Sequence, residues 1–506
     1  MEKQNSSTLR GFIHNYRAKF PEGYEEIVKE VSTEFETTAF SAMDLIKGLS
    51  QILGNNLITE REQKIPYMTD ASYYQGDLPM AVALPDTTEQ VAAVMKYCQD
   101  NSIPVVARGG GTALTGSSIP LKDMLVISLA RFDRILEVHP EDRYAVVEPG
   151  VKLDNLNQHL SRFGFFYPPD PASSIAATIG GSISTNAGGL RASMYGTTKN
   201  WILGLEVVLP NGNIIHTGGK VLKRTAGYDL TALMVGAEGT LGIITKAIVK
   251  IWPVVESRGR ILAYYDTIDK VGSSISEMKG KGITPLIAEF LDKITMHSLS
   301  ETRGLTFPED ASYMLIVDIA STRESIGREL KEAEEVLKKF NPISTEITTD
   351  QAAMERIYEA RKGAYSSLLS ERSSMSERVV IGDIVVPASE LPVALKESEE
   401  KVRKYNLTVA LFGHISDGNI HANIYADIAD QDHMNRVESF QHDFAMIAIK
   451  HGGSVSAEHG VGLEKKDLLR MEFEETNNQY VMEIMKSIRK TFDPKGIMNR
   501  GKMFDQ

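Results

Sequence analysis

The stretch with the clearest chemical potential holds two histidines, His414 and His421, with six residues between them. Its centre is Asp417-Gly418, a favoured loop for a two-residue β-hairpin because both residue types tolerate positive φ. With the loop centred there, Ser416 pairs with Asn419, and His414 lies opposite His421 with the Cβ atoms about 4.5–5.5 Å apart. Two imidazoles at that distance can bind one metal ion. A straight strand could not bring them together, because an odd offset puts two side chains on opposite faces.

A third metal ligand is available further along the chain, in the segment SAEHGVG over residues 456–462. Glu458 offers a hard carboxylate oxygen, and His459 follows it directly. Two histidines and one carboxylate suit a divalent ion that keeps coordination positions open for water or substrate. A second interpretation stands beside this one, because a histidine pair without other context is more often a hydrogen-bonded pair at the surface or in the core.

Three glycine-rich segments form the second group of candidate functional residues: 108–116, 169–189 and 236–242. Glycines without Cβ atoms let backbone N–H groups converge on an anion. The first segment matches neither standard phosphate motif, since Leu114 stands where GxGxxG needs glycine and Ser117 stands where the P-loop needs lysine. Three such loops suit a long ligand with a diphosphate and two ring systems. The alternative is a network of turns that serves packing alone.

These loops need regular elements to position them, and the sequence pattern predicts a mixture of helices and strands. Thr87-x-x-Gln90 is a capping-box candidate that opens a helix, and Gly164 stops a later apolar stripe of helical spacing. The alternation of residue types is typical of strands before and after a Pro210-Asn211-Gly212-Asn213 turn. The predicted helices cover 88–100, 153–163, 326–340 and 480–492, and the predicted strands cover 103–107, 205–209, 214–217, 243–252 and 313–319.

The totals exclude several classes of protein. A chain of 506 residues is too long for one ordinary core and predicts two or three domains. A net charge of −12 without a long basic run argues against a nucleic-acid partner. The single cysteine, Cys98, excludes an intrachain disulfide and a CxxC metal site. No apolar run could span a bilayer and the first residues lack a signal-peptide core, so we expect a cytoplasmic protein, with peripheral membrane contact left open.

Longer segments resemble a known family. PVVARGGGTALTG, DPASSIAATIGGSISTNAGGLRASMYGTTKNWILGLEVVLPNG and GAEGTLGIIT are together similar to the FAD-binding domain of the vanillyl-alcohol oxidase superfamily. Within it, GHISDGNIH and SAEHGVG resemble the GHxGDGNxH and EHGxG motifs of the FAD-linked D-2-hydroxyacid dehydrogenases. That family includes D-lactate dehydrogenase, the flavoprotein subunit of glycolate oxidase and D-2-hydroxyglutarate dehydrogenase. The similarity runs from about residue 61 to the C-terminus.

The resemblance implies an α+β fold: a two-subdomain FAD-binding domain of the vanillyl-alcohol oxidase type with an α+β substrate (cap) domain. With a boundary placed at Pro253, it predicts four parts. They are an N-terminal helical extension (1–60), the FAD-binding domain (61–253), the substrate domain with the metal-site hairpin (254–455) and a C-terminal segment that returns to the flavin (456–506).

The resemblance also implies roles for individual residues. It places metal ligands on His414, His421 and Glu458 and the catalytic base on His459. Arg361, in IYEARKGAY, matches the arginine that grips the substrate carboxylate, and Asn423 matches a substrate-contacting asparagine. We expect one divalent ion there, which is zinc, manganese or iron.

The chain departs from the family pattern in three places. Ser416 replaces a glycine in the hairpin, and Arg500 replaces a proline in a C-terminal motif that resembles DPxxxxNPGK. Residues 381–382 are uncharged where some relatives that accept a dicarboxylate carry a lysine, which favours a small monocarboxylate. Arg372 and Arg378 could compensate for that missing charge.

FAD is expected to be held non-covalently, because the first glycine segment has neither histidine nor cysteine for a covalent bond. Its amides would surround the diphosphate, and the other segments would enclose the rest of the cofactor. The residues that the resemblance assigns to FAD are Arg108, Gly109, Gly110, Gly111, Thr112, Gly116, Ser117, Pro169, Asp170, Ser173, Thr178, Gly180, Gly181, Ser184, Asn186, Ala187, Gly188, Tyr195, Gly196, Glu238, Gly239, Gly242, Ile243, Ile244 and Asn499.

The predicted activity is oxidation of a small D-2-hydroxyacid, first of all D-lactate to pyruvate, by hydride transfer to flavin N5. Glycolate and D-2-hydroxyglutarate are the alternatives within the same enzyme class. A non-catalytic flavin electron-transfer subunit and a metal-binding scaffold without flavin are the alternatives outside it. The electron acceptor would be a quinone, an electron-transferring flavoprotein or a partner subunit, no second nucleotide motif for NAD is evident, and a homodimer is allowed.

Overall fold

The computed structural model describes residues 43–505. The chain divides into two compact units, Met1–Asn55 and Asn56–Gln506. The described part of the first unit is mainly a helix over 43–53. Most of the N-terminal extension predicted over 1–60 therefore lies outside the described residues. The site and the rest of the fold belong to the second unit.

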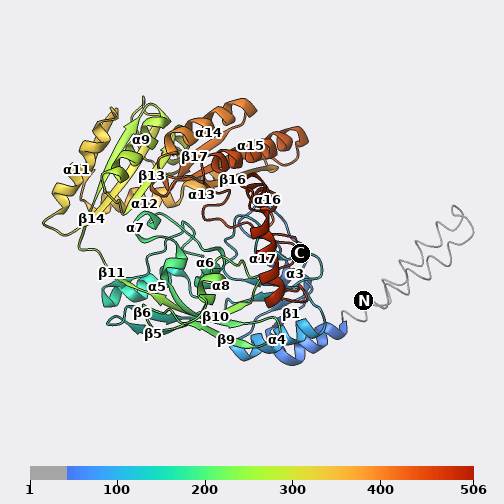
Figure 1. Cartoon of the computed structure of the whole chain (residues 1–506). Helices are drawn as coiled ribbons and strands as arrows, with labels where there is room; N and C mark the ends of the chain where they lie inside the picture. Colours follow the sequence, from blue (N-terminus) through green and yellow to red (C-terminus); the bar gives the residue numbers. More distant parts are fainter. Residues whose placement is uncertain (1–42, 506) are drawn as a thin grey trace, which may run out of the picture. The chain divides into compact units, whose positions relative to one another are not determined.

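The second unit is a mixture of helices and sheets, which confirms the predicted α+β class (Figure 1). Its strands are β1 (Leu57–Ile58), β2 (Val82–Ala83), β3 (Val105–Arg108), β4 (Leu125–Ser128), β5 (Ile135–His139), β6 (Tyr144–Val147), β7 (Phe165–Phe166), β8 (Ile202–Val208), β9 (Ile214–Gly218), β10 (Ile243–Lys250), β11 (Trp252–Pro253), β12 (Ser257–Tyr265), β13 (Ile287–Asp292), β14 (Tyr313–Ser321), β15 (Ser344–Thr348), β16 (Glu377–Val385), β17 (Val409–Gly413) and β18 (Asn419–Asp427). Its α-helices are α3 (Arg61–Lys64), α4 (Thr88–Asp100), α5 (Leu153–Leu160), α6 (Ile179–Thr185), α7 (Ala192–Tyr195), α8 (Leu230–Met234), α9 (Ile268–Gly280), α10 (Lys293–Arg303), α11 (Ile326–Lys338), α12 (Gln351–Lys362), α13 (Ala364–Ser370), α14 (Leu391–Tyr405), α15 (Gln431–Lys450), α16 (Lys466–Glu475) and α17 (Gln479–Phe492). Short 3-10 turns are η1 (Gly54–Asn56), η2 (Ile65–Met68), η3 (Ser161–Phe163), η4 (Thr198–Trp201) and η5 (Ile415–Asp417).

Two sheets carry the glycine-rich segments. The first has the order β1-β2-β4-β3 with parallel pairing of β2, β4 and β3, and the second is antiparallel with the order β5-β6-β10-β8-β9. The first glycine segment follows β3, and residues 236–242 precede β10. One half of the predicted capping box forms, since the Thr87 side chain accepts a hydrogen bond from the amide of Gln90 at the start of α4. The Gln90 side chain accepts from the amide of Asp86 and not from that of Thr87. Gly164 adopts φ of 73° at the end of η3, a conformation that favours glycine.

A seven-stranded antiparallel sheet with the order β15-β12-β14-β13-β17-β18-β16 forms the other layer. Alternate side chains of each strand point to opposite faces, as in β12, where Ile261 joins one apolar cluster and Leu262 joins another. Helices α9, α11, α14 and α15 cover the first face, and α10 and α13 pack on the second (Figure 1). Because both faces are covered, polar side chains at the middle of the sheet are buried.

The hairpin that carries the two histidines differs from the prediction. β17 and β18 are antiparallel neighbours, but the register pairs His421 with Phe412 and not with His414. A two-residue loop does not form, because residues 415–417 wind into η5 and place His414 just before it. The predicted pairing of Ser416 with Asn419 is wrong for the same reason. The amide of Asn419 instead donates to the carbonyl of His414, 3.3 Å away.

Contacts from outside the hairpin hold this longer turn. Nζ of Lys279 donates to the Ser416 carbonyl at 2.6 Å, and the Ser193 hydroxyl in α7 donates to the Ser416 hydroxyl at 2.7 Å. A Cβ atom on Gly418 would collide with the carbonyl of Val386, and Gly418 has φ of 83°. The serine that replaces the family glycine thus gains a hydrogen bond to α7.

The C-terminal segment packs against the first sheet. α17 ends at Phe492, before Pro494, as predicted. Beyond it, the Asn499 amide donates to the Val105 carbonyl, and the Val105 amide donates to the Ile497 carbonyl. The end of the chain therefore lies beside β3, the strand that leads into the first glycine segment. The predicted domain boundaries stay predictions.

Candidate functional site

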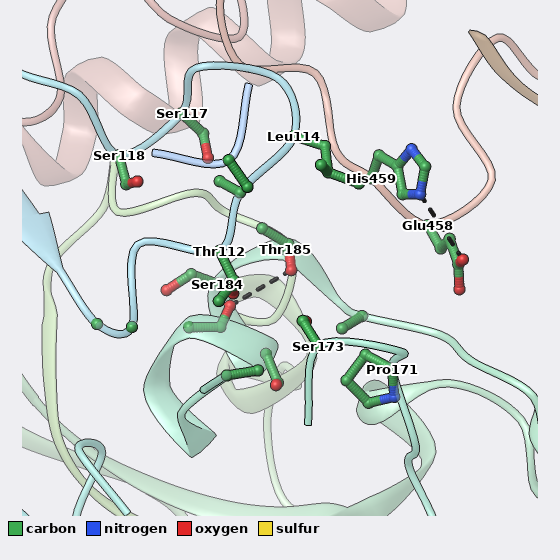
Figure 2. Close-up of a pocket in the computed structure, with 18 of the residues that line it drawn as sticks. Thr112, Leu114, Ser117, Ser118, Pro171, Ser173, Ser184, Thr185, Glu458 and His459 are labelled. Atoms are coloured by element: carbon green, nitrogen blue, oxygen red, sulfur yellow. Dashed lines mark hydrogen bonds and ion pairs between the residues drawn. The ribbon is translucent and has the colours of Figure 1, made fainter. Parts of the chain in front are cut away.

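A cavity of about 330 Å³ lies among the three glycine-rich segments and the seven-stranded sheet. That volume is in the range of small-ligand sites. Figure 2 shows Thr112, Ser173 and Ser184 along its wall, with Glu458 and His459 at one side. Of the residues assigned to FAD, the cavity is lined by Arg108, Gly109, Gly110, Gly111, Thr112, Ser117, Ser173, Gly180, Gly181, Ser184, Ala187, Gly188, Glu238, Gly239, Gly242, Ile243 and Ile244.

The first glycine segment packs closely against α6 and the turn before it. A Cβ atom on Gly109 would collide with the Thr178 hydroxyl, and one on Gly110 would collide with the Ala176 carbonyl. Gly111 has φ of 66°, where residues with a side chain are strained. Glycines at these positions leave backbone, and not side chains, facing the cavity, which fits a loop that binds an anion such as a diphosphate.

Eight of the assigned residues lie outside the lining of this cavity: Gly116, Pro169, Asp170, Thr178, Asn186, Tyr195, Gly196 and Asn499. Several of them hold the segments that do line it. Thr178 caps α6 by accepting from the Gly181 amide at 3.3 Å. Nδ2 of Asn499 donates to the carbonyls of Ser117, at 3.0 Å, and Glu238, at 2.6 Å. The contribution of these eight residues to FAD binding stays a prediction. The contacts of Thr178 and Asn499 indicate that these two residues hold the segments that line the cavity.

Glu238 has a similar supporting contact although it lines the cavity. Its carboxylate is buried and accepts from the amides of Val461, at 2.6 Å, and Gly462, at 2.8 Å. The glycine-rich segment 236–242 is thereby joined to the loop that carries Glu458 and His459. The Glu238 carboxylate thus connects the glycine-rich wall of the cavity to the loop that carries Glu458 and His459.

The three candidate metal ligands converge at the other side of the cavity. Oε1 of Glu458 lies 3.0 Å from Nε2 of His414 and 3.4 Å from Nε2 of His421. The imidazole centroids are 5.3 Å apart and the rings are nearly perpendicular. Two nitrogens and one carboxylate oxygen directed at one point form a donor set that fits a divalent cation. The side chains meet although the predicted strand register is wrong.

Both histidines are oriented by carboxylates behind them. Nδ1 of His414 lies 2.6 Å from Oε1 of Glu289, and Nδ1 of His421 lies 3.3 Å from Oδ1 of Asp383. A metal-binding histidine commonly has a carboxylate at its second nitrogen, because that bond fixes the tautomer and raises ligand basicity. We had not predicted these roles for Glu289 and Asp383. The available signal was a lone acid inside each apolar run, LIAEFL and VVIGDIVV.

Asp383 also fixes the loop that carries Glu458 and His459. Its Oδ2 accepts from the amides of Ala457, Glu458 and His459 at 3.1, 3.2 and 3.1 Å, and from Nζ of Lys465 at 3.1 Å. Asp383 is buried, and the donated hydrogen bonds compensate for its lost hydration. One carboxylate on β16 therefore sets the position of the candidate base and of a candidate ligand.

The pKa values of Glu458, His414 and His459 are shifted in different directions by their surroundings. Burial raises the pKa of Glu458, but the charge of His414 outweighs that effect and holds the pKa well below 4.5. Burial lowers the pKa of His414, but Glu289 and Glu458 hold it well above 6.5. Burial lowers the pKa of His459 to about 4 against the opposing charge of Asp383. Near neutral pH the His459 imidazole is thus unprotonated and can accept a proton.

The two predicted substrate residues line the same cavity. Arg361 is buried at the end of α12, with Cζ 4.5 Å from the centre of the Phe412 ring and Nη2 2.6 Å from Oε2 of Glu289. Neither Nε nor Nη2 has a hydrogen-bond partner among residues 43–505, so the contact with Glu289 is an ion pair. Nδ2 of Asn423 donates to the Ala410 carbonyl at 3.2 Å, and Oδ1 has no partner within the same described range. Both residues therefore have polar capacity left for a ligand.

Comparisons with known proteins agree with this architecture. The FAD binding domain family matches residues 79–218, and the family described as FAD linked oxidases, C-terminal domain, matches residues 255–503. Glycolate oxidase subunit GlcD of Bacillus subtilis is 36% identical over 91% of this chain and 97% of its own length. D-lactate dehydrogenase of Archaeoglobus fulgidus is 32% identical over 83% of this chain and 90% of its own length.

Solved structures show the same fold at low identity. p-Cresol methylhydroxylase superimposes with a TM-score of 0.76 at 18% identity, covering 91% of this chain and 96% of that one. Alkyldihydroxyacetonephosphate synthase does so with a TM-score of 0.70 at 16% identity, covering 90% of this chain and 85% of that one.

The two matched families define a FAD-linked oxidoreductase, and its fold is the one seen in p-cresol methylhydroxylase. The chain belongs to the FAD-linked oxidoreductase family of glycolate oxidase subunit GlcD and the D-lactate dehydrogenases. No helix among the described residues is long and apolar enough to cross a membrane.

Proposed function

We propose that this protein oxidises a small D-2-hydroxyacid, first of all D-lactate, and that a divalent cation bound by His414, His421 and Glu458 takes part. The convergence of these three side chains beside Arg361 in one cavity carries the proposal. A flavin electron-transfer subunit without substrate chemistry would have no use for this buried cluster. FAD supplies the two-electron acceptor when it is bound.

Each of the chain's residues near the substrate has a separate role. Arg361 binds the carboxylate, because a guanidinium can donate two parallel hydrogen bonds to it. A divalent cation lowers the pKa of a hydroxyl that coordinates it. His459 then takes the hydroxyl proton, and general-base help of this kind is worth about 10²–10⁴-fold. The contacts of Asp383 hold His459 and Glu458 in a fixed relation during this step.

The apolar part of the cavity lining favours a substrate with a short, uncharged side chain. Ile381 and Phe412 line the cavity. Lys362 lines it too, and its Nζ donates to the Ser174 hydroxyl at 2.8 Å. Arg372 and Arg378, which could have bound a second carboxylate, lie outside the lining and donate to the carbonyls of Leu369 and Met375 instead. Glycolate is the second candidate substrate, since the GlcD relative shares 36% identity with this chain.

The test is an anaerobic titration of the flavin absorbance in the holoenzyme with D-lactate, L-lactate, glycolate and D-2-hydroxyglutarate. Bleaching by D-lactate at the lowest concentration is the expected result. Bleaching by glycolate alone would show that glycolate, and not D-lactate, is the substrate. No bleaching by any member of the panel would overturn the proposal.

The reduced flavin would then pass its electrons to a second protein or to a small electron carrier. Relatives that are named subunits of glycolate oxidase favour a multi-subunit assembly for this chain too. We propose a quinone or an electron-transferring flavoprotein as the acceptor. Turnover assays that compare these acceptors with O₂ test this point, and fast turnover with O₂ alone would contradict it.

A further inference from the structure

Glu289 lies between the candidate metal site and the candidate substrate site and touches both. One carboxylate oxygen, Oε1, lies 2.6 Å from Nδ1 of His414. The other, Oε2, lies 2.6 Å from Nη2 of Arg361. No other carboxylate among residues 43–505 forms ion pairs with both a member of the His414–His421–Glu458 cluster and Arg361.

The strand register places Glu289 there. In the antiparallel pairing of β13 with β17, Phe290 lies opposite Gly413. Extending this register by one residue places Glu289 opposite His414, which directly follows β17. Glu289 is completely buried in the middle of the seven-stranded sheet. An unpaired carboxylate at such a depth would be costly, so its two cationic or polar partners are needed for it to remain there.

Arg361 is fixed on one side and free on the other. Nη2 forms an ion pair with Oε2 of Glu289, and the centre of the Phe412 ring lies 4.5 Å from Cζ of the guanidinium. Neither Nη2 nor Nε donates a hydrogen bond among the described residues. A guanidinium binds a carboxylate well only when its planar fork is held in one orientation. The Glu289 contact supplies that orientation.

We propose that Glu289 is a positioning residue that joins substrate recognition to metal binding, with one oxygen for Arg361 and one for His414. This inference rests on the proposed function, because it assigns Glu289 a role toward that substrate and that cation. Replacement of Glu289 should weaken both functions together, although this side chain contacts neither ligand in the proposal. A residue that only stabilises the sheet would change neither.

The test compares E289Q with the wild-type holoenzyme, both stripped of metal and titrated with Mn²⁺ or Zn²⁺ by equilibrium dialysis. We expect E289Q to keep FAD and to bind the metal about 10–100-fold more weakly, the usual cost of removing such an outer carboxylate. At saturating metal, the KM for the hydroxyacid should rise about tenfold, since a neutral amide holds the guanidinium less firmly.

The matched control is D318N. Asp318 forms the other fully buried arginine pair of this sheet within the described residues, with Oδ1 2.5 Å from Nε of Arg260, and it contacts no member of the cavity cluster. D318N should lower the melting temperature and leave metal affinity and KM unchanged. If E289Q does not fold, E289D replaces it: the charge stays but the shorter side chain cannot reach both partners, so metal affinity or KM must still change.

The outcomes separate the two proposals. A wild-type holoenzyme that binds neither cation overturns the metal part of the proposed function. A wild-type protein that binds metal, together with an E289Q variant of equal metal affinity and equal KM, overturns the role of Glu289 alone.

Discussion

The imidazoles of His421 and His459 stack face to face, with centroids 4.9 Å apart and an angle of 5° between the planes. Both rings turn Nδ1 toward Asp383, at 3.3 Å for His421 and 3.8 Å for His459. One buried carboxylate thus orients a candidate metal ligand and the candidate base, which come from distant parts of the chain. The proposed base and the proposed cation site are held in one fixed relation.

Replacement of His459 tests the base. We expect H459A to retain FAD and metal and to lose about 100-fold or more in kcat, since general-base catalysis typically contributes about 10²–10⁴-fold. Stopped-flow flavin reduction measures the step directly. H442A is the control, because His442 is 60% exposed and lies outside the cavity. A loss below about tenfold in H459A would contradict the assignment.

Replacement of Glu458 tests the cation site. We expect E458Q to lose the bound metal and the activity and to keep the flavin. None of the three ligands belongs to a glycine segment that would hold FAD, and glutamine keeps the size of the side chain that packs against Gly188. Elemental analysis and the flavin spectrum report the two losses independently. E141Q is the control, since His139, Glu141 and Asp142 form another acidic cluster, which is more exposed. Metal that disappears in E141Q and persists in E458Q would place the cation elsewhere.

Replacement of Lys502 tests the support given by the C-terminal segment. Nζ of Lys502 is buried and donates to the carbonyls of Ser117, at 3.0 Å, and Ile119. K502M removes the Lys502 donor from the Ile119 carbonyl and leaves the Ser117 carbonyl with Asn499 alone, at a cost of about 1–3 kcal/mol. We expect a lower flavin-to-protein ratio after dialysis. K495M is the control, because Lys495 also donates to a carbonyl, that of Gln99, but is exposed; equal flavin retention in both variants would refute the role of Lys502.

The buried Asp292 predicts a pH dependence of stability. Burial raises its pKa to about 6, against hydrogen bonds from Leu411 and Thr295. The folded protein therefore keeps the proton to higher pH than the unfolded chain. Asp292 adds stability at low pH, and this contribution is lost as the pH rises from about 4 to about 6.

The variant D292N removes this titration. Its free energy of unfolding should show a shallower fall with pH in that window, by at most about 1.4 kcal/mol per pH unit. Urea unfolding at several pH values measures the slope, with D310N as an exposed control. Equal slopes in wild type and D292N would show that Asp292 does not titrate there.

Much of the fold follows from local sequence signals. Ile326–Lys338 lies where its spacing predicted it, because the helix buries the apolar face that its own periodicity creates. Tyr313–Ser321 and Gln479–Phe492 also lie where they were predicted, although Arg489 is the one residue of the second segment that is buried. The family class followed from the resemblance of the long glycine-rich segments to a known FAD-binding domain. The hairpin register was not, because Asp417-Gly418 meets the rule for a two-residue loop while Lys279 and Ser193 stabilise a different turn from outside.

The sequence by itself determined which residue types are available for chemistry: two histidines, a glutamate and a base within two short motifs, and an arginine in a third. The tertiary structure alone decided which of them are joined, and it brought in Glu289 and Asp383, whose partners lie on other elements: α12, the turn after β17, and β18. The reason is physical. A carboxylate in an apolar strand is costly by itself, and its function depends on the donors that sheet pairing places beside it.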